Sequence, residues 1–397
     1  MKTNFFARRV MIGLAAAMIA LWGNPGAATS APPPVESISL EELMNIPVYG
    51  ASKYEQKVTE APSSVSIVTS RDIVKYGYRT LADIIRAQRE FYVNYDRNYH
   101  YIGVRGFLRP GDYNLRILLL IDGHRTNDAV YDSAFIGTAF LLDVDLIDRV
   151  EFIRGPSSSL YGSNAFFGVI NVITKTGKAY QGAELSGEAG SFGTYKARAT
   201  YGKRGESGIQ GVVSGTWYDS KGDDRLFFKE FDDPATNNGV AENADGDKFY
   251  SAFANLSWRD FTLQGAWVDR TKKIPTAPWD TFFNDNRTQT TDGMAYVDLK
   301  YDGYFGRGWN LTARANYNYY WYFGDYVYDI NADPLNPSLV VNRDKTWANW
   351  AGAELTMRKR AWETHMLTFG AEYRNNYRQD QLNFDDTDPR AVYMDEK

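Results

Sequence analysis

The chain of 397 residues contains no cysteine and only three histidines. Without cysteine it has neither a disulfide framework nor the lipid-modified cysteine of a lipoprotein. His100, His124 and His365 show no spacing suited to a metal ion, and no thiol is available to join them. No Ser/His/Asp set and no carboxylate pair indicates a hydrolase, so we expect no enzymatic activity, no metal site and no cofactor.

Long apolar runs are absent as well. The mean hydropathy is −0.45, and no run reaches the ~20 residues that a membrane-spanning helix needs. An apolar stretch at 11–22 follows Arg8 and Arg9 and precedes Asn24-Pro25-Gly26. This pattern is typical of a signal peptide, which we place at residues 1–30, with cleavage expected between Ala28 and Ala31.

Positive charge is not in excess, since the formal net charge is −5, and this argues against a nucleic-acid partner. Aromatic residues are abundant, with 28 tyrosines and 10 tryptophans. A transmembrane β-barrel has this composition because its rims carry aromatic belts and its lipid face takes only alternate residues. Composition alone leaves open an aromatic-rich secreted β-protein, such as a sugar-binding sandwich.

The stretch 149–177 organises the first half of the chain. Its apolar residues at 150–153 predict a strand, which must end at Gly155 and Pro156 because proline donates no ladder hydrogen bond. A serine-rich turn through Tyr161 and Gly162 follows, and 169–173 predicts a second strand. No Gly-Lys-Ser/Thr ending and no following helix is present, so the stretch is not a nucleotide-binding loop.

Four short motifs follow one another in this region: Asp148-Arg149-Val150-Glu151-Phe152, Arg154-Gly155-Pro156, Leu160-Tyr161-Gly162 and the run 168–175. Their succession strongly resembles that of the plug domain of TonB-dependent outer-membrane receptors. The resemblance implies an α+β plug domain at 61–178, followed by a transmembrane antiparallel β-barrel that is incomplete at 183–397. It assigns the plug motif to Gly155, Pro156, Tyr161, Gly162 and Asn171.

The same resemblance implies a receptor for active transport in the outer membrane of a Gram-negative bacterium. Its partners would be the TonB energy-coupling protein, outer-membrane lipid and a small extracellular ligand. Ferric siderophores are the leading ligand class, and cobalamin, another metal complex or a glycan is the alternative. A passive porin or adhesin is the alternative from a different class, although the plug pattern before the first barrel strand argues against it.

The mature N-terminus, 31–60, begins with Ala31 and three consecutive prolines and is expected to be extended. An extended segment can add itself to the sheet edge of another protein. In the resembled family a short segment called the TonB box does this, and here its candidates are consecutive: Ile46, Pro47, Val48, Tyr49, Gly50, Ala51 and Ser52. A plain tether is the alternative interpretation.

Within the plug, strands are expected at 61–69, 102–107 and 117–123. Short helices are expected at 71–76, ending at Gly77, and after Thr80, which forms a capping box with Asp83. Polar and aromatic connections at 94–101, 109–114 and 130–137 separate these elements. Family plugs point such loops toward the ligand, which implies these contact candidates: Tyr99, His100, Arg109, Tyr113, Tyr131 and Asp132.

From Ala183 onward apolar and polar residues alternate, and we count nine strands. Long connections are expected at 219–248, 270–292 and 320–345, and tight turns between them. Because family barrels have 22 strands, about half of the barrel is expected to be missing. The acidic connection with Asp232, Asp233, Asn243, Asp245 and Asp247 lacks the distal glutamate of an EF-hand, which favours a solvated loop over a calcium site.

Four charged residues are expected to hold the plug in place. Arg105 and Arg154 match family arginines that pair with glutamates on the inner barrel wall. Glu354 and Glu372 alternate with apolar neighbours, so both are expected to face the lumen. Bidentate pairs between these groups would be strong but breakable. The alternative is lumen-lining charge with water as its partner.

Overall fold

The structure is a computed structural model that describes residues 64–109, 111–306, 308–331, 336–362 and 365–397. Before residue 64 it describes only the backbone of two paired strands, β1 (Pro47–Val48) and β2 (Gln56–Lys57). The predicted signal peptide and the other TonB-box candidates lie outside the described residues. Within the part of the chain that is described, no helix is long and apolar enough to cross a membrane.

The chain divides between Lys175 and Thr176 into two compact units. We call residues 64–175 the N-terminal unit and residues 176–397 the sheet unit, and each is described by itself.

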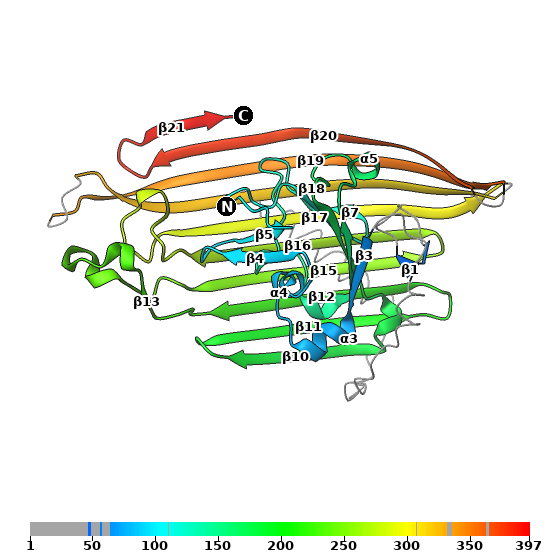
Figure 1. The fold of residues 1–397 in the computed structure, drawn as a ribbon, viewed down its shortest axis with the longest axis horizontal. Coiled ribbons are helices and arrows are strands. Elements are labelled where there is room, and N and C mark those ends of the chain that lie inside the picture. Colours follow the sequence, from blue (N-terminus) through cyan, green and yellow to red (C-terminus); the bar gives the residue numbers. More distant parts are fainter. Residues whose placement is uncertain are drawn as a thin grey trace. The chain divides into compact units, whose positions relative to one another are not determined.

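The N-terminal unit contains a five-stranded sheet in the order β3-β8-β9-β6-β7 and a separate hairpin of β4 and β5 (Figure 1). β6 and β9 run parallel, and the other pairs are antiparallel. The predicted strands are present, and β4 and β7 are additional. The bounds are β3 Ser64–Thr69, β4 Phe91–Tyr95, β5 His100–Val104, β6 Ile117–Ile121, β7 His124–Arg125, β8 Ile147–Arg154 and β9 Gly168–Thr174.

The core of this unit lies around β6, whose five residues are all buried, as its continuous apolar run predicts. Several polar side chains that are buried there form hydrogen bonds or ion pairs. The Asn171 side chain donates to Glu151 at 3.2 Å and accepts from the backbone N–H of Gly123 at 3.1 Å. Arg149 pairs with Glu151 at 3.0 Å. The plug-motif asparagine therefore joins β8, β9 and the turn after β6.

Two short helices begin where the sequence predicts, and the first also ends there. Helix α3 (Ser70–Tyr76) has Thr69 as its N-cap and ends at Gly77, whose φ of 65° favours glycine. Helix α4 (Leu81–Arg86) starts with the predicted capping box between Thr80 and Asp83 and buries Leu81, Ala82, Ile84 and Ile85. The 3₁₀ turn η2 (Val144–Leu146) precedes β8.

The serine-rich connection after β8 differs from the prediction. Gly155, with φ of 100°, ends the strand as expected, but Ser158–Tyr161 then form one helical turn, α5, in place of a plain turn. Four residues are too few for helical periodicity to show in a sequence. The turn is fixed because Tyr161 is buried and its carbonyl oxygen accepts from Arg125 at 2.8 Å.

The sheet unit is built on one large antiparallel sheet in the order β10-β11-β12-β15-β16-β17-β18-β19-β20-β21 (Figure 1). Among the described residues it has ten strands: the nine predicted ones and β21. β10 and β21 each pair on one side only, so this sheet is open. The bounds are β10 Gly182–Gly190, β11 Thr194–Arg204, β12 Gln210–Ser220, β15 Asp247–Trp258, β16 Phe261–Lys273, β17 Gln289–Phe305, β18 Trp309–Asp329, β19 Leu339–Ala361, β20 His365–Asp385 and β21 Ala391–Glu396.

The predicted long connection at 320–345 is wrong. β18 continues to Asp329 and β19 begins at Leu339, because aromatic residues such as Tyr320 and Trp321 pair across the two strands with Ala348 and Trp347. The connections 221–246 and 274–288 are long, as predicted. The first contains β13 (Arg225–Phe227), η4 (Lys229–Phe231), η5 (Pro234–Gly239) and β14 (Val240–Glu242), the second contains η6 (Pro278–Asp280), and η3 (Gly177–Ala179) precedes the sheet.

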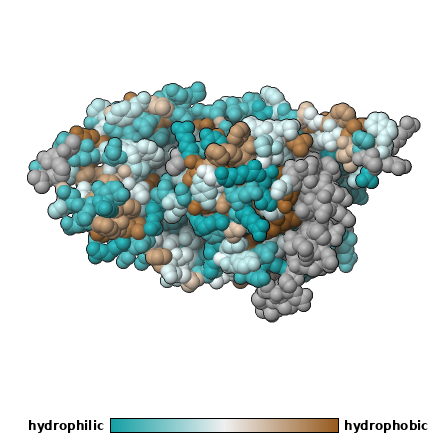
Figure 2. Space-filling model, in the orientation of Figure 1, coloured by the Kyte–Doolittle hydropathy of each residue, from teal (hydrophilic) through white to brown (hydrophobic). Residues whose placement is uncertain are grey.

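The two faces of the sheet differ in chemistry. We call the face with Glu184, Arg198 and Arg314 the polar face; Arg198 pairs with Glu184 at 2.7 Å and Arg314 with Asp298 at 3.6 Å. The opposite face, which we call the apolar face, exposes these residues: Leu185, Tyr195, Trp217, Leu299, Leu355, Phe369 and Tyr373. Figure 2 shows hydrophilic residues over much of the visible surface, with apolar residues in separate patches. The period-two pattern therefore sorts side chains as predicted.

Candidate functional site

Three of the predicted ligand-contact residues lie together in the N-terminal unit. The rings of Tyr99 and Tyr113 meet edge to face with centroids 5.7 Å apart, and Tyr131 lies 6.1 Å from Tyr113. Phe135, which the sequence did not single out, lies 6.2 Å from Tyr99. We call Tyr99, Tyr113, Tyr131 and Phe135 the loop aromatic cluster. All four side chains are half-buried, so part of each ring is accessible to a ligand, and the three tyrosines add hydroxyl groups.

Asn114 joins the three loops that carry this cluster. Its side-chain oxygen accepts from the backbone N–H of Ile102 at 2.6 Å, and its amide donates to the carbonyl oxygens of His100 and Ala134, both at 2.9 Å. Tyr113 and Asn114 have φ values of 51° and 65°, a conformation that asparagine tolerates well. Sequence reasoning missed Asn114, because the partners of its side chain lie 12 to 20 residues away.

The loop with Tyr131 and Asp132 is held by two buried polar residues. The Asp128 carboxylate accepts from the backbone N–H groups of Val130 and Tyr131, each at 2.7 Å, and of Ser133 at 2.8 Å. Burial raises the pKa of this carboxyl, and the three backbone donors offset part of that rise. Asn127 donates to the carbonyl oxygen of Asp132 at 2.9 Å. Asp132 itself is exposed, with φ of 53°.

The other predicted contacts lie differently. His100 belongs to β5, not to a loop, and its ring stacks on Tyr95 with centroids 4.3 Å apart. Of the predicted connection 94–101, only 96–99 lies between the strands β4 and β5. Arg109 is exposed in the turn before Tyr113. The loop aromatic cluster is therefore formed by aromatic rings alone, and the exposed residues Asp132 and Arg109 lie in the loops that carry it.

The two arginines that are expected to hold the plug in place share a partner within the N-terminal unit. Arg105 Nε lies 2.9 Å from Oε2 of Glu90, and Arg154 Nη1 lies 3.6 Å from Oε1 of the same residue. The hydrogen bond from Arg105 lowers the pKa of Glu90 below its usual value, and the positive charges of both arginines add to this. Glu90 was not predicted, because nothing in its sequence neighbourhood marks it.

The two glutamates that are expected to hold the plug in place lie side by side on neighbouring strands of the sheet unit. Glu354 on β19 pairs in register with Glu372 on β20 and, on its other side, with Arg314 on β18. All three belong to the polar face, in agreement with the predicted alternation. Pairing of these glutamates with Arg105 and Arg154 stays a prediction.

Two long connections of the sheet unit pack against each other. Phe231, from 221–246, stacks on Phe283, from 274–288, with centroids 4.2 Å apart. They belong to a small apolar core with Ala241 and Ala244. The sequence gave no sign of this core, because its members lie about 50 residues apart.

Two acidic residues, one in the connection 221–246 and one at the start of β15, form ion pairs with basic side chains of β16. Lys272, which is 1% exposed, binds Asp245 at 2.7 Å, and Arg270 binds Asp247 at 3.1 Å. Among the described residues, no group of three or more His, Cys, Asp or Glu is arranged to hold a metal ion. These acids therefore serve as anchors of the connection.

Comparison with known proteins gives concordant matches. A family defined as the TonB-dependent receptor plug domain matches residues 57–169. The vitamin B12 transporter BtuB of Vibrio vulnificus is 25% identical over 292 residues, which cover 71% of this chain and 44% of the transporter. The iron-regulated outer membrane virulence protein of Vibrio cholerae is 33% identical over 132 residues, 32% of this chain and 20% of that protein.

A solved structure shares the fold. The ferric yersiniabactin uptake receptor FyuA from Yersinia pestis superposes with a TM-score of 0.60 at 16% identity, over 84% of this chain and 51% of that receptor. The chain thus spans about half or less of the length of the proteins that it matches. The plug match, the four motifs and a plug followed by an open antiparallel sheet together show that the chain belongs to the TonB-dependent receptors.

Proposed function

We propose that the protein is an active-transport receptor in the outer membrane of a Gram-negative bacterium, reached after cleavage of a signal peptide at 1–30. The observation that carries this proposal is a plug-family unit followed by an antiparallel sheet with one polar and one apolar face. Such a sheet suits a membrane wall, because alternate residues meet lipid and water. Its family consists of transport receptors and not of enzymes.

The ligand is proposed to bind at the loop aromatic cluster. Half-buried tyrosine rings bind flat ligand surfaces at low entropic cost, and their hydroxyls add hydrogen bonds. A ferric siderophore is the leading class, because exposed Arg109 adds positive charge that suits an anionic chelate. FyuA is a ferric yersiniabactin uptake receptor and BtuB a vitamin B12 transporter, so cobalamin is the second candidate.

Energy is proposed to come from the TonB protein, which would pair with the TonB-box candidate Ile46–Ser52. The backbone of Pro47–Val48 is a strand paired with Gln56–Lys57, which supports the proposal that this stretch pairs with the TonB protein. The pairing of Arg105 and Arg154 with Glu354 and Glu372 is proposed to hold the plug until TonB acts.

The proposal is tested by uptake of radiolabelled ferric siderophores and of labelled cobalamin in a strain that lacks the gene. Uptake of one of these ligands should be lost when the gene is deleted. Reintroducing the gene should restore this uptake only when TonB is present. Tyr113→Ala should weaken cell-surface binding of that ligand by about tenfold, whereas Tyr76→Ala, an exposed tyrosine on α3, should not. Unchanged uptake of every compound after deletion would remove the proposed function.

A further inference from the structure

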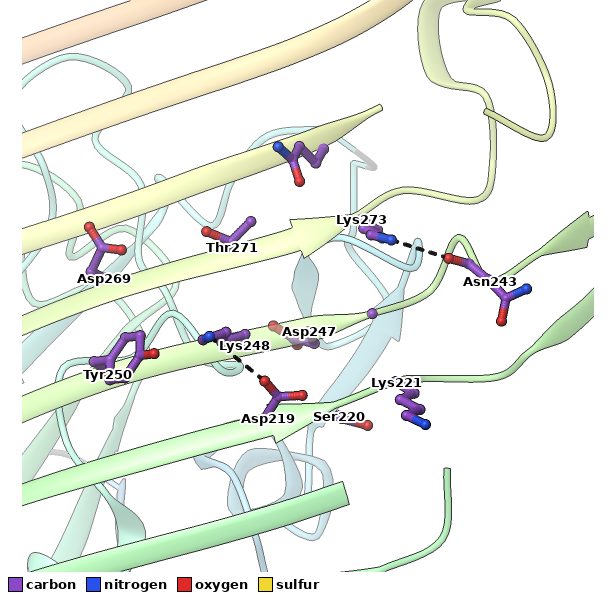
Figure 3. Close-up of a pocket in the computed structure, with 12 residues that line it drawn as sticks. Asp219, Ser220, Lys221, Asn243, Asp247, Lys248, Tyr250, Asp269, Thr271 and Lys273 are labelled. Atoms are coloured by element: carbon purple, nitrogen blue, oxygen red, sulfur yellow. Dashed lines mark hydrogen bonds and ion pairs between the residues drawn. The ribbon is translucent and has the colours of Figure 1, made fainter. Parts of the chain in front are cut away.

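A pocket of about 540 Å³ lies at one end of the sheet unit, beside the connection 221–246 (Figure 3). Most of its strand residues belong to the apolar face: the register places Asp219 opposite Lys248, and Tyr250 opposite Asp269. Thr271 and Lys273 on β16 continue this row, and Gln289 on β17 faces Lys273. We call this cavity the outer-face pocket.

The pocket begins where the aromatic residues of the apolar face end. Trp217 and Tyr250 are register partners and are exposed, and the next pair on the same face, toward the long connection, is Asp219 and Lys248. If the sheet spans the membrane as proposed above, aromatic residues mark the level of the lipid headgroups. The outer-face pocket then lies at headgroup height and opens sideways toward the bilayer.

The three lysines of the pocket keep hydrogen-bonding capacity for a ligand. Lys248 is hydrogen-bonded to Tyr250 and lies 3.9 Å from Asp219, and Lys273 reaches the carbonyl oxygen of Asn243 at 3.5 Å, so each ammonium keeps donors for a ligand (Figure 3). Lys221 also lines the cavity. Three ammonium groups on one cavity provide the point charges that bind phosphate.

Three carboxylates also line the pocket, and each has a partner within the protein. Asp219 lies 3.9 Å from Lys248, Asp247 is bound to Arg270 at 3.1 Å, and Asp269 accepts from the indole of Trp321 at 3.1 Å. Together with Asn243, Gln289 and Thr271 they present acceptors and donors to hydroxyl groups. The ring of Tyr250 adds an apolar face of the kind on which sugar rings pack.

We propose that the outer-face pocket binds the phosphorylated sugar headgroup of a glycolipid from the outer leaflet of the membrane. Phosphate binds the lysines, the sugar hydroxyls bind the amides and carboxylates, and the acyl chains lie along the exposed apolar face beside Trp217. The position of the pocket on this face favours a lipid that arrives from the bilayer over a solute that arrives from water. This inference rests on the proposed membrane location.

The test measures retention of lipid A by the full chain purified in detergent, using native mass spectrometry and titration with fluorescent lipid A. The triple variant Lys221→Gln, Lys248→Gln, Lys273→Gln should bind about a hundredfold more weakly, because each lysine contributes about 1 kcal/mol to binding an anionic headgroup. The control is Lys203→Gln, an exposed lysine on the apolar face of the neighbouring strand β11, at the opposite end of the sheet, which should bind normally.

Two results would overturn the inference: equal lipid A binding by the wild type and the triple variant, or displacement of lipid A by millimolar inorganic phosphate alone, which indicates a site for free anions. Uptake of the transported ligand is measured in the same variants. Loss of lipid A binding with normal uptake supports the pocket and leaves the proposed function intact. Absence of uptake in the wild type contradicts the proposed function and not the pocket.

Discussion

Glu90 and Arg105 are joined twice. The Arg105 side chain donates to the Glu90 carboxylate at 2.9 Å, and the Arg105 backbone N–H donates to the Glu90 carbonyl oxygen at 2.9 Å. Both residues have positive φ, 70° and 51°, so the ion pair and the turn geometry support each other. Arg154 approaches the same carboxylate, and one unpredicted acid thus gathers both family arginines.

The first prediction concerns Glu90→Gln. Because the folded-state pKa of Glu90 is lowered, its charged form stabilises the fold above the usual glutamate pKa, and this contribution is lost as the pH falls through the lowered value. We expect faster hydrogen exchange at 90–107 in the variant at pH 6, and a smaller difference between variant and wild type at pH 3. Glu206→Gln, on an exposed turn, is the control, and a difference that does not shrink on acidification contradicts the assignment.

The second prediction concerns the proposed lock. Arg154→Ala, and separately the pair Glu354→Gln and Glu372→Gln, should raise the passive entry of small solutes into cells while ligand binding to the cell surface is kept. Leakage is measured as sensitivity to an antibiotic that intact outer membranes exclude. If Arg154→Ala leaks and the double glutamate variant does not, the pairing with the sheet unit is wrong and Glu90 is the relevant partner.

The third prediction is that Asn114→Ala costs about 1–3 kcal/mol, because it leaves the Ile102 N–H and two carbonyl oxygens without the partner they have now. The loops that carry Tyr113 and Tyr131 should loosen, and ligand affinity should fall even though no cluster side chain has changed. Equilibrium binding and chemical unfolding report the two effects. Asn94→Ala, exposed on β4, should change stability by less than about 0.5 kcal/mol.

The fourth prediction concerns Gly293 on β17. A Cβ built there lies 1.8 Å from Cε2 of Trp321, so Gly293→Ala must displace the indole from its contact with Asp269. Such overpacking costs about 1–3 kcal/mol and should lower the thermal unfolding temperature of the chain in detergent. Gly187→Ala is a matched control in β10, since nothing lies within 4 Å of its Cβ. Equal unfolding temperatures for the two variants would refute the packing argument.

The fifth prediction is that Lys272→Met releases the connection 221–246. The ammonium donates to the carbonyl oxygens of Asp245 and Lys273 and to the Asp245 carboxylate, and breaking a buried pair costs about 3–5 kcal/mol. Limited trypsin digestion should then cleave faster after Arg225 or Lys229. The control Lys203→Met should show the wild-type cleavage rate. If Lys272→Met also shows that rate, the contact between the two connections is enough to hold 221–246 in place and the prediction is wrong.

Local patterns determined much of this protein. The capping boxes at Thr69 and Thr80 act over three residues, the continuous apolar run of β6 requires burial on both faces, and period two assigns Glu354 and Glu372 to one face of the sheet. The four motifs between Asp148 and Lys175 carried the family. Each of these signals lies within a few residues of the structure that it specifies, so a sequence displays it directly.

Tertiary structure decided the features whose partners are far away in the chain. The extension of β18 and β19 through 320–345 depends on pairing between the two strands, since neither segment alone shows where pairing ends. Glu90 meets Arg154 across 64 residues, and Asn114 meets Ala134 across 20. These contacts form only when folding brings loops from separate strands together. The residue types alone therefore could not predict them, because the geometry of the folded chain determines which side chains meet.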